Sequence, residues 1–185
     1  MNPSIFIWTI YAIWVIVVVY LTVSGIGVKQ ETKGHLLQSF GLMFAIIAAF
    51  LLPLLPIFNF LNFAPVNPLL SSIGLILCAA GMAFLVWGRQ HLGRNWSQTV
   101  SIKKEPELIT SGPYRYVRHP MYAGGLIACI GSAIVCGGAW IFLLLILGTI
   151  FLGRVGAEDK LMEKQFPNEF PDYKKRTKAL IPFVW

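Results

Sequence analysis

The stretch that decides the fold is HPMYAGGLIACIGSAIVCGGAWIFLLLILGTIFLG, residues 119–153, which contains no Asp, Glu, Lys or Arg. A membrane-spanning helix needs about 20 apolar residues, so this run is long for one helix and short for two. Cys136-Gly137-Gly138 near its middle is typical of a turn. The stretch therefore predicts either one span or a tight hairpin of two short helices. The distribution of charged residues in the rest of the chain distinguishes these two possibilities.

The rest of the chain is also that of an integral membrane protein. Of the 185 residues, 56% are hydrophobic and 12% are charged, with a mean hydropathy of +0.68; a soluble domain carries about twice that charged fraction. Uncharged segments predict further spans at about 5–23, 36–55 and 69–88. Pro53 and Pro56 close or kink the far end of the second of these.

The distribution of basic residues favours five spans over four. With five, the loops 28–35 and 89–118 and the tail from residue 154 share one side, which then holds all 15 basic residues. With four, the basic residues of the tail would lie on the opposite side. We therefore expect an all-α protein of five transmembrane helices, the last two a hairpin, with its N-terminus outside and its C-terminus in the cytoplasm. The 89–118 loop and the C-terminal tail would form a cytoplasmic cap.

The net charge of +7 fits this topology, because anionic lipid headgroups line the cytoplasmic face. Basic residues scattered along loops, without a recognition module, argue against a nucleic-acid partner. The first span lacks the features of a cleaved signal peptide. If the source is bacterial, the protein belongs in the plasma (inner) membrane. Cys78, Cys129 and Cys136 have no metal-ligand spacing and are expected to be buried, so no metal site is predicted.

A dense polar motif, GPYRYVRHPMYAGG (112–125), precedes and enters the fourth apolar run. Pro120 suits the first turn of a helix, which places Arg118 and His119 at a helix N-terminus, where backbone N–H groups attract anions. Such a site could hold a carboxylate of a substrate or of an amino-acid-like cofactor. The alternative is a simple membrane anchor, in which Arg118 binds headgroups and the tyrosines form an aromatic belt at Tyr114, Tyr116 and Tyr122.

A second polar group ends the last apolar run. Arg154 and Glu158 are four residues apart and share a helix face, so both can point into one cavity or simply pair with each other. Asp159 adds a second acid that would compete for the same base. In the tail, Pro167 and Pro171 are expected to break an amphipathic helix, and residues 174–178 read as a headgroup-binding run.

These residues resemble the isoprenylcysteine carboxyl methyltransferase family and related membrane phospholipid methyltransferases. The resemblance rests on the segments 108–114 (LITSGPY) and 118–124 (RHPMYAG) and on a tail with Arg154, Glu158-Asp159 and the segment 173–183. Together they cover about the last ninety residues in the expected order, whereas residues 1–88 match only as hydrophobic helices.

The resemblance implies methyl transfer from S-adenosylmethionine, with S-adenosylhomocysteine as the product, to a lipophilic acceptor at the cytoplasmic membrane face. It implies Arg154 and His119 as catalytic residues, with Arg154 contacting the substrate. The implied cofactor-binding residues are Pro106, Glu107, Leu108, Ile109, Tyr114, His119, Pro120, Met121, Tyr122 and Glu158, with Thr99 a weaker candidate. The family often has His where this chain has Pro106, so that contact could involve only the backbone.

The acceptor expected from this resemblance is the carboxylate of an isoprenylcysteine-like molecule or another prenylated substrate, and the alternative is a phospholipid or other small lipophilic molecule. A nicotinamide-dependent membrane reductase and a non-catalytic lipid-binding protein are further alternatives. A carboxylate needs no general base, whereas an amine or thiol would need one, for which His119 and Glu158 are the candidates. We expect one domain over 1–185, with three N-terminal helices in 1–88 and the catalytic, cofactor-binding region in 89–185. The oligomeric state is not predicted.

Overall fold

A computed structural model describes residues 3–25, 67–96 and 107–181 of the chain. Its α-helices are α1 (Pro3–Gly25), α3 (Pro68–Leu92), α4 (Pro120–Cys136), α5 (Gly138–Gln165) and α6 (Phe170–Arg176), joined by the 3₁₀ helices η3 (Gly93–Asn95) and η4 (Gly112–Arg115). Within these residues the one β feature is an isolated parallel bridge between Val117 and Lys178. The expectation of an all-helical protein agrees with this part of the chain.

Three helices, α1, α3 and α5, are long and apolar enough to cross a membrane, and α4 is a shorter apolar helix. The protein is a multi-pass integral membrane protein. The predicted spans at 5–23 and 69–88 correspond to α1 and α3, and the hairpin prediction is confirmed, because α4 ends at Cys136 and α5 begins at Gly138. The predicted span 36–55 lies outside the described residues.

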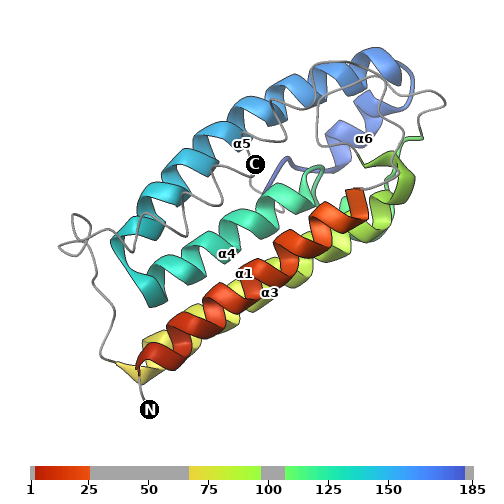
Figure 1. The fold of residues 1–185 in the computed structure, drawn as a ribbon. Helices are drawn as coiled ribbons and strands as arrows, with labels where there is room; N and C mark the ends of the chain where they lie inside the picture. Colours follow the sequence, from red (N-terminus) through yellow and green to blue (C-terminus); the bar gives the residue numbers. More distant parts are fainter. Residues whose placement is uncertain (1–2, 26–66, 97–106, 182–185) are drawn as a thin grey trace.

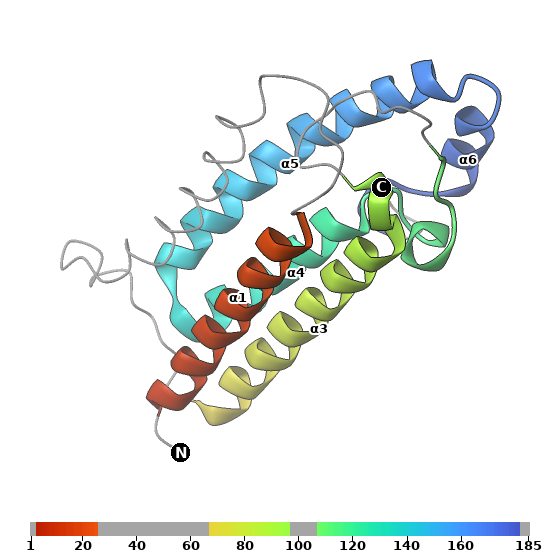
Figure 2. The ribbon, with the colours of Figure 1, turned by 45° about the vertical axis from the view of Figure 1, so that its right-hand side comes forward.

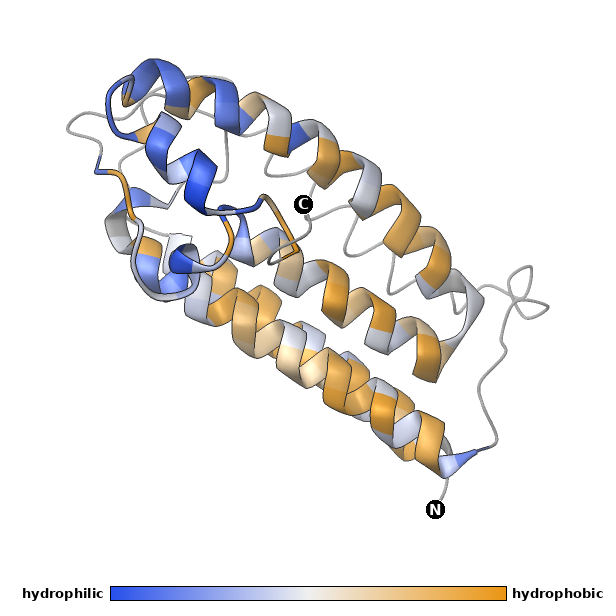
Figure 3. Cartoon of the chain, turned by 180° about the vertical axis from the view of Figure 1, so that it is seen from behind, coloured by the Kyte–Doolittle hydropathy of each residue, from blue (hydrophilic) through white to orange (hydrophobic). Residues whose placement is uncertain are grey.

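The helices form an elongated bundle with one polar end. Helix α1 runs alongside α3, α4 runs antiparallel to α3, and α5 returns antiparallel to α4 (Figures 1 and 2). The C-terminal ends of α1, α3 and α5 and the start of α4 therefore lie at the same end, next to α6. Hydrophilic residues gather there, over α6 and the last turns of α5 (Figure 3).

Glycines bring α3 and α4 into backbone contact. A Cβ atom on Gly81 would lie 2.5 Å from the Ala128 nitrogen and 2.6 Å from the Gly124 oxygen, and one on Gly74 would lie 2.8 Å from the Gly131 oxygen. Small residues let helix backbones approach closely in a membrane. These glycines therefore serve packing inside the bundle.

A buried hydrogen bond ties α1 to α4 in the core. The Trp14 indole Nε1 donates to the Ser132 hydroxyl at 2.9 Å, and Ser132 itself is fully buried. Trp140 of α5 lies against Trp14, with ring centroids 5.2 Å apart. The three cysteines, Cys78, Cys129 and Cys136, are buried free thiols, as expected.

Arg89 joins the ends of α1 and α3 and was not singled out from the sequence. It lies inside α3, so the predicted loop 89–118 begins within a helix, and its side chain is buried. Its guanidinium donates to the carbonyls of Ser24 (2.5 Å) and Gly93 (3.0 Å) and lies 4.3 Å from the centre of the Trp96 ring. Arg89 thus holds α1 against α3 at the polar end.

Residues 107–110 have no regular secondary structure. Two local expectations for the polar end are corrected. Helix α5 continues for three turns past the apolar run and ends at Gln165. Pro171 lies in the first turn of α6, where a proline is tolerated, so it begins this helix instead of breaking one. The chain enters η4 at Gly112, which has a positive φ of 58°.

Candidate functional site at the start of α4 and the end of α5

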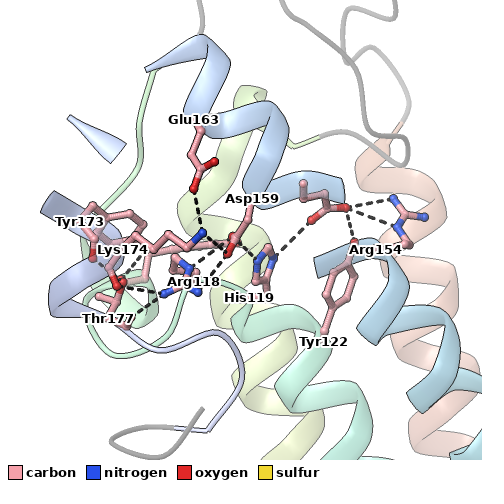
Figure 4. A network of polar contacts seen from close by, with 11 residues as sticks. Arg118, His119, Tyr122, Arg154, Asp159, Glu163, Tyr173, Lys174 and Thr177 are labelled. Atoms are coloured by element: carbon pink, nitrogen blue, oxygen red, sulfur yellow. Dashed lines mark hydrogen bonds and ion pairs between the residues drawn. The ribbon is translucent and has the colours of Figure 1, made fainter. Parts of the chain in front are cut away.

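The site is built around His119, which precedes Pro120 at the start of α4, as predicted. Its two ring nitrogens face two consecutive acids of α5. Nδ1 lies 3.3 Å from a Glu158 carboxylate oxygen, and Nε2 lies 3.1 Å from an Asp159 carboxylate oxygen. The start of α4 and the end of α5 therefore meet through one imidazole, as Figure 4 shows for His119 and Asp159.

Glu158 is bonded on its other side as well. The Tyr122 hydroxyl donates to its Oε1 atom at 2.5 Å, and Arg154 approaches the same atom at 3.3 Å through Nη2. The predicted pairing of Arg154 and Glu158 across one helical turn is present. Glu158 thus links an aromatic hydroxyl, a guanidinium and an imidazole in one partly buried cluster.

Three rings stack along the cluster. His119 and Tyr122 are nearly parallel, with ring centroids 5.6 Å apart and planes at 7°, and Phe151 stacks on Tyr122 at 4.6 Å and 17°. The Arg154 guanidinium lies 5.9 Å from the Tyr122 ring centre. Phe151 was not predicted as a site residue. The available signal was its spacing, since 151, 154 and 158 share one face of a helix.

Arg118 does not occupy the role expected of it. Its guanidinium makes a double contact with Asp159, at 3.0 and 3.3 Å, and donates to the carbonyls of Thr177 and Lys174. We expected this guanidinium to bind an external carboxylate or lipid headgroups, but it forms hydrogen bonds within the protein instead. The expected competition of Glu158 and Asp159 for one base is also wrong, because Asp159 pairs with Arg118 and Glu158 pairs with Arg154.

The segment after α6 completes the site. The backbone N–H groups of Arg118 and His119 donate to the carbonyls of Lys178 (2.8 Å) and Ala179 (3.0 Å). The predicted headgroup-binding run is therefore only partly exposed: Thr177 is buried, and Lys174 pairs with Glu163 at 2.8 Å. No sequence signal pointed to these backbone contacts.

The cluster changes the acid–base properties of His119. Burial lowers the pKa of the imidazole, but hydrogen bonds to Asp159 and Glu158 and the charges of these acids raise it by more, so the pKa lies above its ordinary value. Carboxylates only accept hydrogen bonds, so two carboxylate partners require two N–H donors, which only the protonated ring has. Geometry and electrostatics both favour the imidazolium.

Tyr114 is buried beneath this cluster, and its carbonyl accepts a 2.7 Å hydrogen bond from the Tyr173 hydroxyl. Burial raises the pKa of the Tyr114 phenol. Of the three tyrosines in the aromatic-belt alternative, only Tyr116 is well exposed, at 52%. That alternative does not describe Tyr114 or Tyr122.

The structure describes five of the other predicted cofactor residues. Pro120 is fully buried, and Met121 packs against the α1–α3–α4 core. Glu107 is exposed, whereas Leu108 and Ile109 are half-buried. Pro106 and Thr99 lie outside the described residues.

A protein-family comparison and two similarity searches place the chain among known proteins. The family described as phospholipid methyltransferase matches residues 70–169, which include most of α3 and all of α4 and α5. The chain belongs to this family of membrane methyltransferases, which includes the isoprenylcysteine carboxyl methyltransferases. The recognition made from the sequence is confirmed at this level.

Among individual proteins, the chain is similar to the protein-S-isoprenylcysteine O-methyltransferase of Saccharomyces cerevisiae, with 27% identity over 89% of this chain and 73% of the yeast protein. It is 33% identical to the nickel-cobalt-cadmium resistance protein NccN of Alcaligenes xylosoxydans over 49% of this chain and 44% of that protein. The solved structure of a eukaryotic intramembrane Ras methyltransferase, an isoprenylcysteine carboxyl methyltransferase, matches 79% of this chain and 53% of its own, with a TM-score of 0.60 and 23% identity. This chain therefore spans about half the length of the last two.

Proposed function

We propose that this protein uses S-adenosylmethionine to methylate the carboxylate of a lipophilic acceptor, an isoprenylcysteine-like thioether acid, at the cytoplasmic membrane face. Membership of the methyltransferase family supports methyl transfer, and the similarity to the yeast enzyme over most of the chain supports this class of acceptor. The proposal that the acceptor is a carboxylate rests on the contacts of His119, which favour its protonated form.

Methylation of an amine or a thiol requires a base that can take a proton. His119, held between two carboxylates, has no lone pair to accept one. Glu158 already accepts from Tyr122, His119 and Arg154. A carboxylate acceptor is ionised at neutral pH and needs no base, so the cluster favours it over the amine of a phospholipid headgroup.

The donor set around Glu158 fits a cationic methyl donor that carries an ammonium group and ribose hydroxyls. A carboxylate has about four acceptor positions, so Glu158 retains capacity to accept a further hydrogen bond. Tyr122 stacks between His119 and Phe151, and an electron-rich ring such as Tyr122 attracts cations. When bound, S-adenosylmethionine supplies an electrophilic methyl group on a sulfonium.

Arg154 is the residue proposed to hold the acceptor. It is partly exposed, at 27% of its side chain, and lies at the junction of the apolar and polar parts of α5. A guanidinium can bind a carboxylate through two parallel hydrogen bonds. Holding two reactants in line supplies roughly 7–11 kcal/mol of the barrier in favourable cases, so positioning by Arg154 and Glu158 is the main contribution that we expect from the protein.

Titration calorimetry of the detergent-solubilised protein with S-adenosylmethionine and S-adenosylhomocysteine tests donor binding. Transfer of labelled methyl groups should then be measured to a prenylated N-acetylcysteine, to its amide as a matched control without a carboxylate, and to phosphatidylethanolamine. We expect product with the free acid alone. Methylation of phosphatidylethanolamine instead would identify the phospholipid alternative, and absence of donor binding would refute the proposal.

Single substitutions test the division of roles. Glu158→Ala should chiefly weaken donor binding, and Arg154→Ala should chiefly raise the KM for the acceptor. Because the two side chains contact each other, the double variant should be less impaired than the sum of the single effects predicts. Equal donor affinity in Glu158→Ala and the parent would contradict this assignment.

The remaining predictions from the sequence become part of this proposal. They are the donor contacts of residues 106–109, Tyr114, Pro120 and Met121, the single methyltransferase domain over 1–185, and an orientation with the N-terminus outside. Labelling of the Arg115→Cys variant from each side of sealed vesicles tests the orientation. Arg115 lies in the exposed η4 turn at the polar end, which should face the cytoplasm.

A further inference from the structure

Asp159 is distinct from Glu158 in what it contacts. Asp159 is 7% exposed and its carboxylate bonds both Arg118 and His119, while Lys174 lies 3.9 Å from it. Glu158, in contrast, bonds Tyr122 and Arg154. Two consecutive acids of one helix therefore face two different groups of residues.

Arg118 extends this group to the C-terminal segment. One end of its guanidinium faces Asp159 and the other faces the carbonyls of Thr177 and Lys174, with only 10% of the side chain exposed. The neighbouring backbone N–H groups of residues 118 and 119 bond to residues 178 and 179. Figure 4 shows Arg118 between Asp159 and the segment that contains Thr177. The contact joins three parts of the chain: the start of α4, the end of α5 and the segment after α6.

We propose that Arg118 and Asp159 are positioning residues for methyl transfer: Asp159 holds His119 as an imidazolium that in turn orients Glu158, and Arg118 fixes Asp159 to the C-terminal segment. Neither residue contacts the reacting groups. In this arrangement the order of contacts is Arg118, Asp159, His119, Glu158, and then Tyr122 and Arg154. The C-terminal segment thereby acts on the donor site without touching it.

The charges around His119 set the sign of each substitution. The titratable and charged groups near it are Arg118 beside it, Tyr122 on α4, Arg154, Glu158 and Asp159 on α5, and Tyr173 and Lys174 on α6. Asp159→Asn removes a negative charge in contact with the ring and should lower the pKa of His119. Arg118→Gln removes a positive charge while leaving Asp159 in place, and it should raise that pKa. A loss of local packing alone would move both variants toward the ordinary pKa of histidine.

The test is NMR titration of the detergent-solubilised protein labelled at histidine, with His119→Gln used to assign the signal among the three histidines. We expect the midpoint of His119 to fall in Asp159→Asn and to rise in Arg118→Gln. Asp172→Asn is the charge-matched control, because Asp172 is exposed and forms an ion pair with Lys175. It should leave the midpoint unchanged. This measurement does not depend on the identity of the acceptor, so it can fail while the proposed function stands.

A kinetic measurement completes the test and rests on the proposed function. Misplacement of a catalytic contact by about 1 Å can reduce the rate on the order of 100-fold. We expect Asp159→Asn to lower kcat/KM for S-adenosylmethionine by about 10- to 100-fold at pH 8, with partial recovery at pH 6, where His119 protonates again. An unchanged midpoint in Asp159→Asn, or a lowered one in Arg118→Gln, would overturn the proposal. Should Asp159→Asn fail to fold, the direction of the shift in Arg118→Gln decides alone.

Discussion

Replacing Gly81 by alanine tests the packing that places α4 against α3. The added Cβ would lie 2.5 Å from the Ala128 nitrogen and 2.6 Å from the Gly124 oxygen, about 1 Å closer than the ordinary separation of roughly 3.5 Å. The obstructing atoms are backbone, so no side chain can rotate away and the helices themselves must separate. Overpacking of a core costs about 1–3 kcal/mol, and we expect Gly81→Ala near the upper end of that range.

For a chain of this size, 1 kcal/mol corresponds to about 2–4 °C in Tm, so Gly81→Ala should lower Tm by about 6–12 °C. The buried free thiols Cys78, Cys129 and Cys136 provide the assay. A maleimide dye that fluoresces on reaction with thiols should report their exposure as the solubilised protein is heated.

Gly153→Ala is the matched control. A Cβ at Gly153 in α5 would meet no atom of the described residues within 4 Å, and alanine is favoured over glycine in a helix by up to about 1 kcal/mol. Its Tm should be equal to that of the parent or slightly higher. A Tm for Gly81→Ala within 2 °C of the parent would refute the close approach of α3 and α4.

Three further predictions concern single contacts. The pKa of His119 is raised in the folded state. The contribution of His119 to the stability of the fold is therefore fully present below the unfolded-state pKa of about 6.5 and is lost as the pH rises through the folded-state pKa. The Tm of the parent should fall on the alkaline side, and that of His119→Gln should change less. Tyr173→Phe leaves the Tyr114 carbonyl without its 2.7 Å donor and should cost about 1–3 kcal/mol; burial raises the pKa of Tyr173 to about 12, so the loss should not depend on pH between 6 and 9. Ser132→Ala removes the acceptor of the Trp14 indole and should cost about 1–2 kcal/mol in the membrane interior; an unchanged Tm in the thiol assay would contradict it.

Local signals in the sequence predicted the parts of the site that depend on neighbouring residues. The break at Gly137, the start of α4 at Pro120 and the pairing of Arg154 with Glu158 each follow from a rule that spans a few residues. The positive-inside rule favoured two helices in residues 119–153, and the structure contains both.

Contacts between distant segments could not be predicted in this way. Arg118 and Asp159 are 41 residues apart, and each could equally have bound a headgroup, a ligand or another partner. Arg89 has the pattern of an anchor at a helix end, and only the packing of α1 on α3 shows that it is buried. Phe151 shares a helix face with Arg154 and Glu158, but the apolar run gives no sign that this face meets a tyrosine of another helix.

The length of α5 bears on how one helix could serve both the lipophilic acceptor and the polar donor of the proposed reaction. At 1.5 Å per residue, its 28 residues extend about 42 Å, whereas the hydrocarbon layer is about 30 Å thick. A helix that enters the hydrocarbon at Gly138 therefore leaves it about 20 residues later, at the level of Glu158. Exposed apolar side chains such as Leu145, Ile146 and Ile150 lie on the hydrocarbon side of that level. Arg154, one turn inside it, could then reach a headgroup-level carboxylate whose apolar chain stays among the lipids, so the proposed acceptor would lie at the boundary between the two phases.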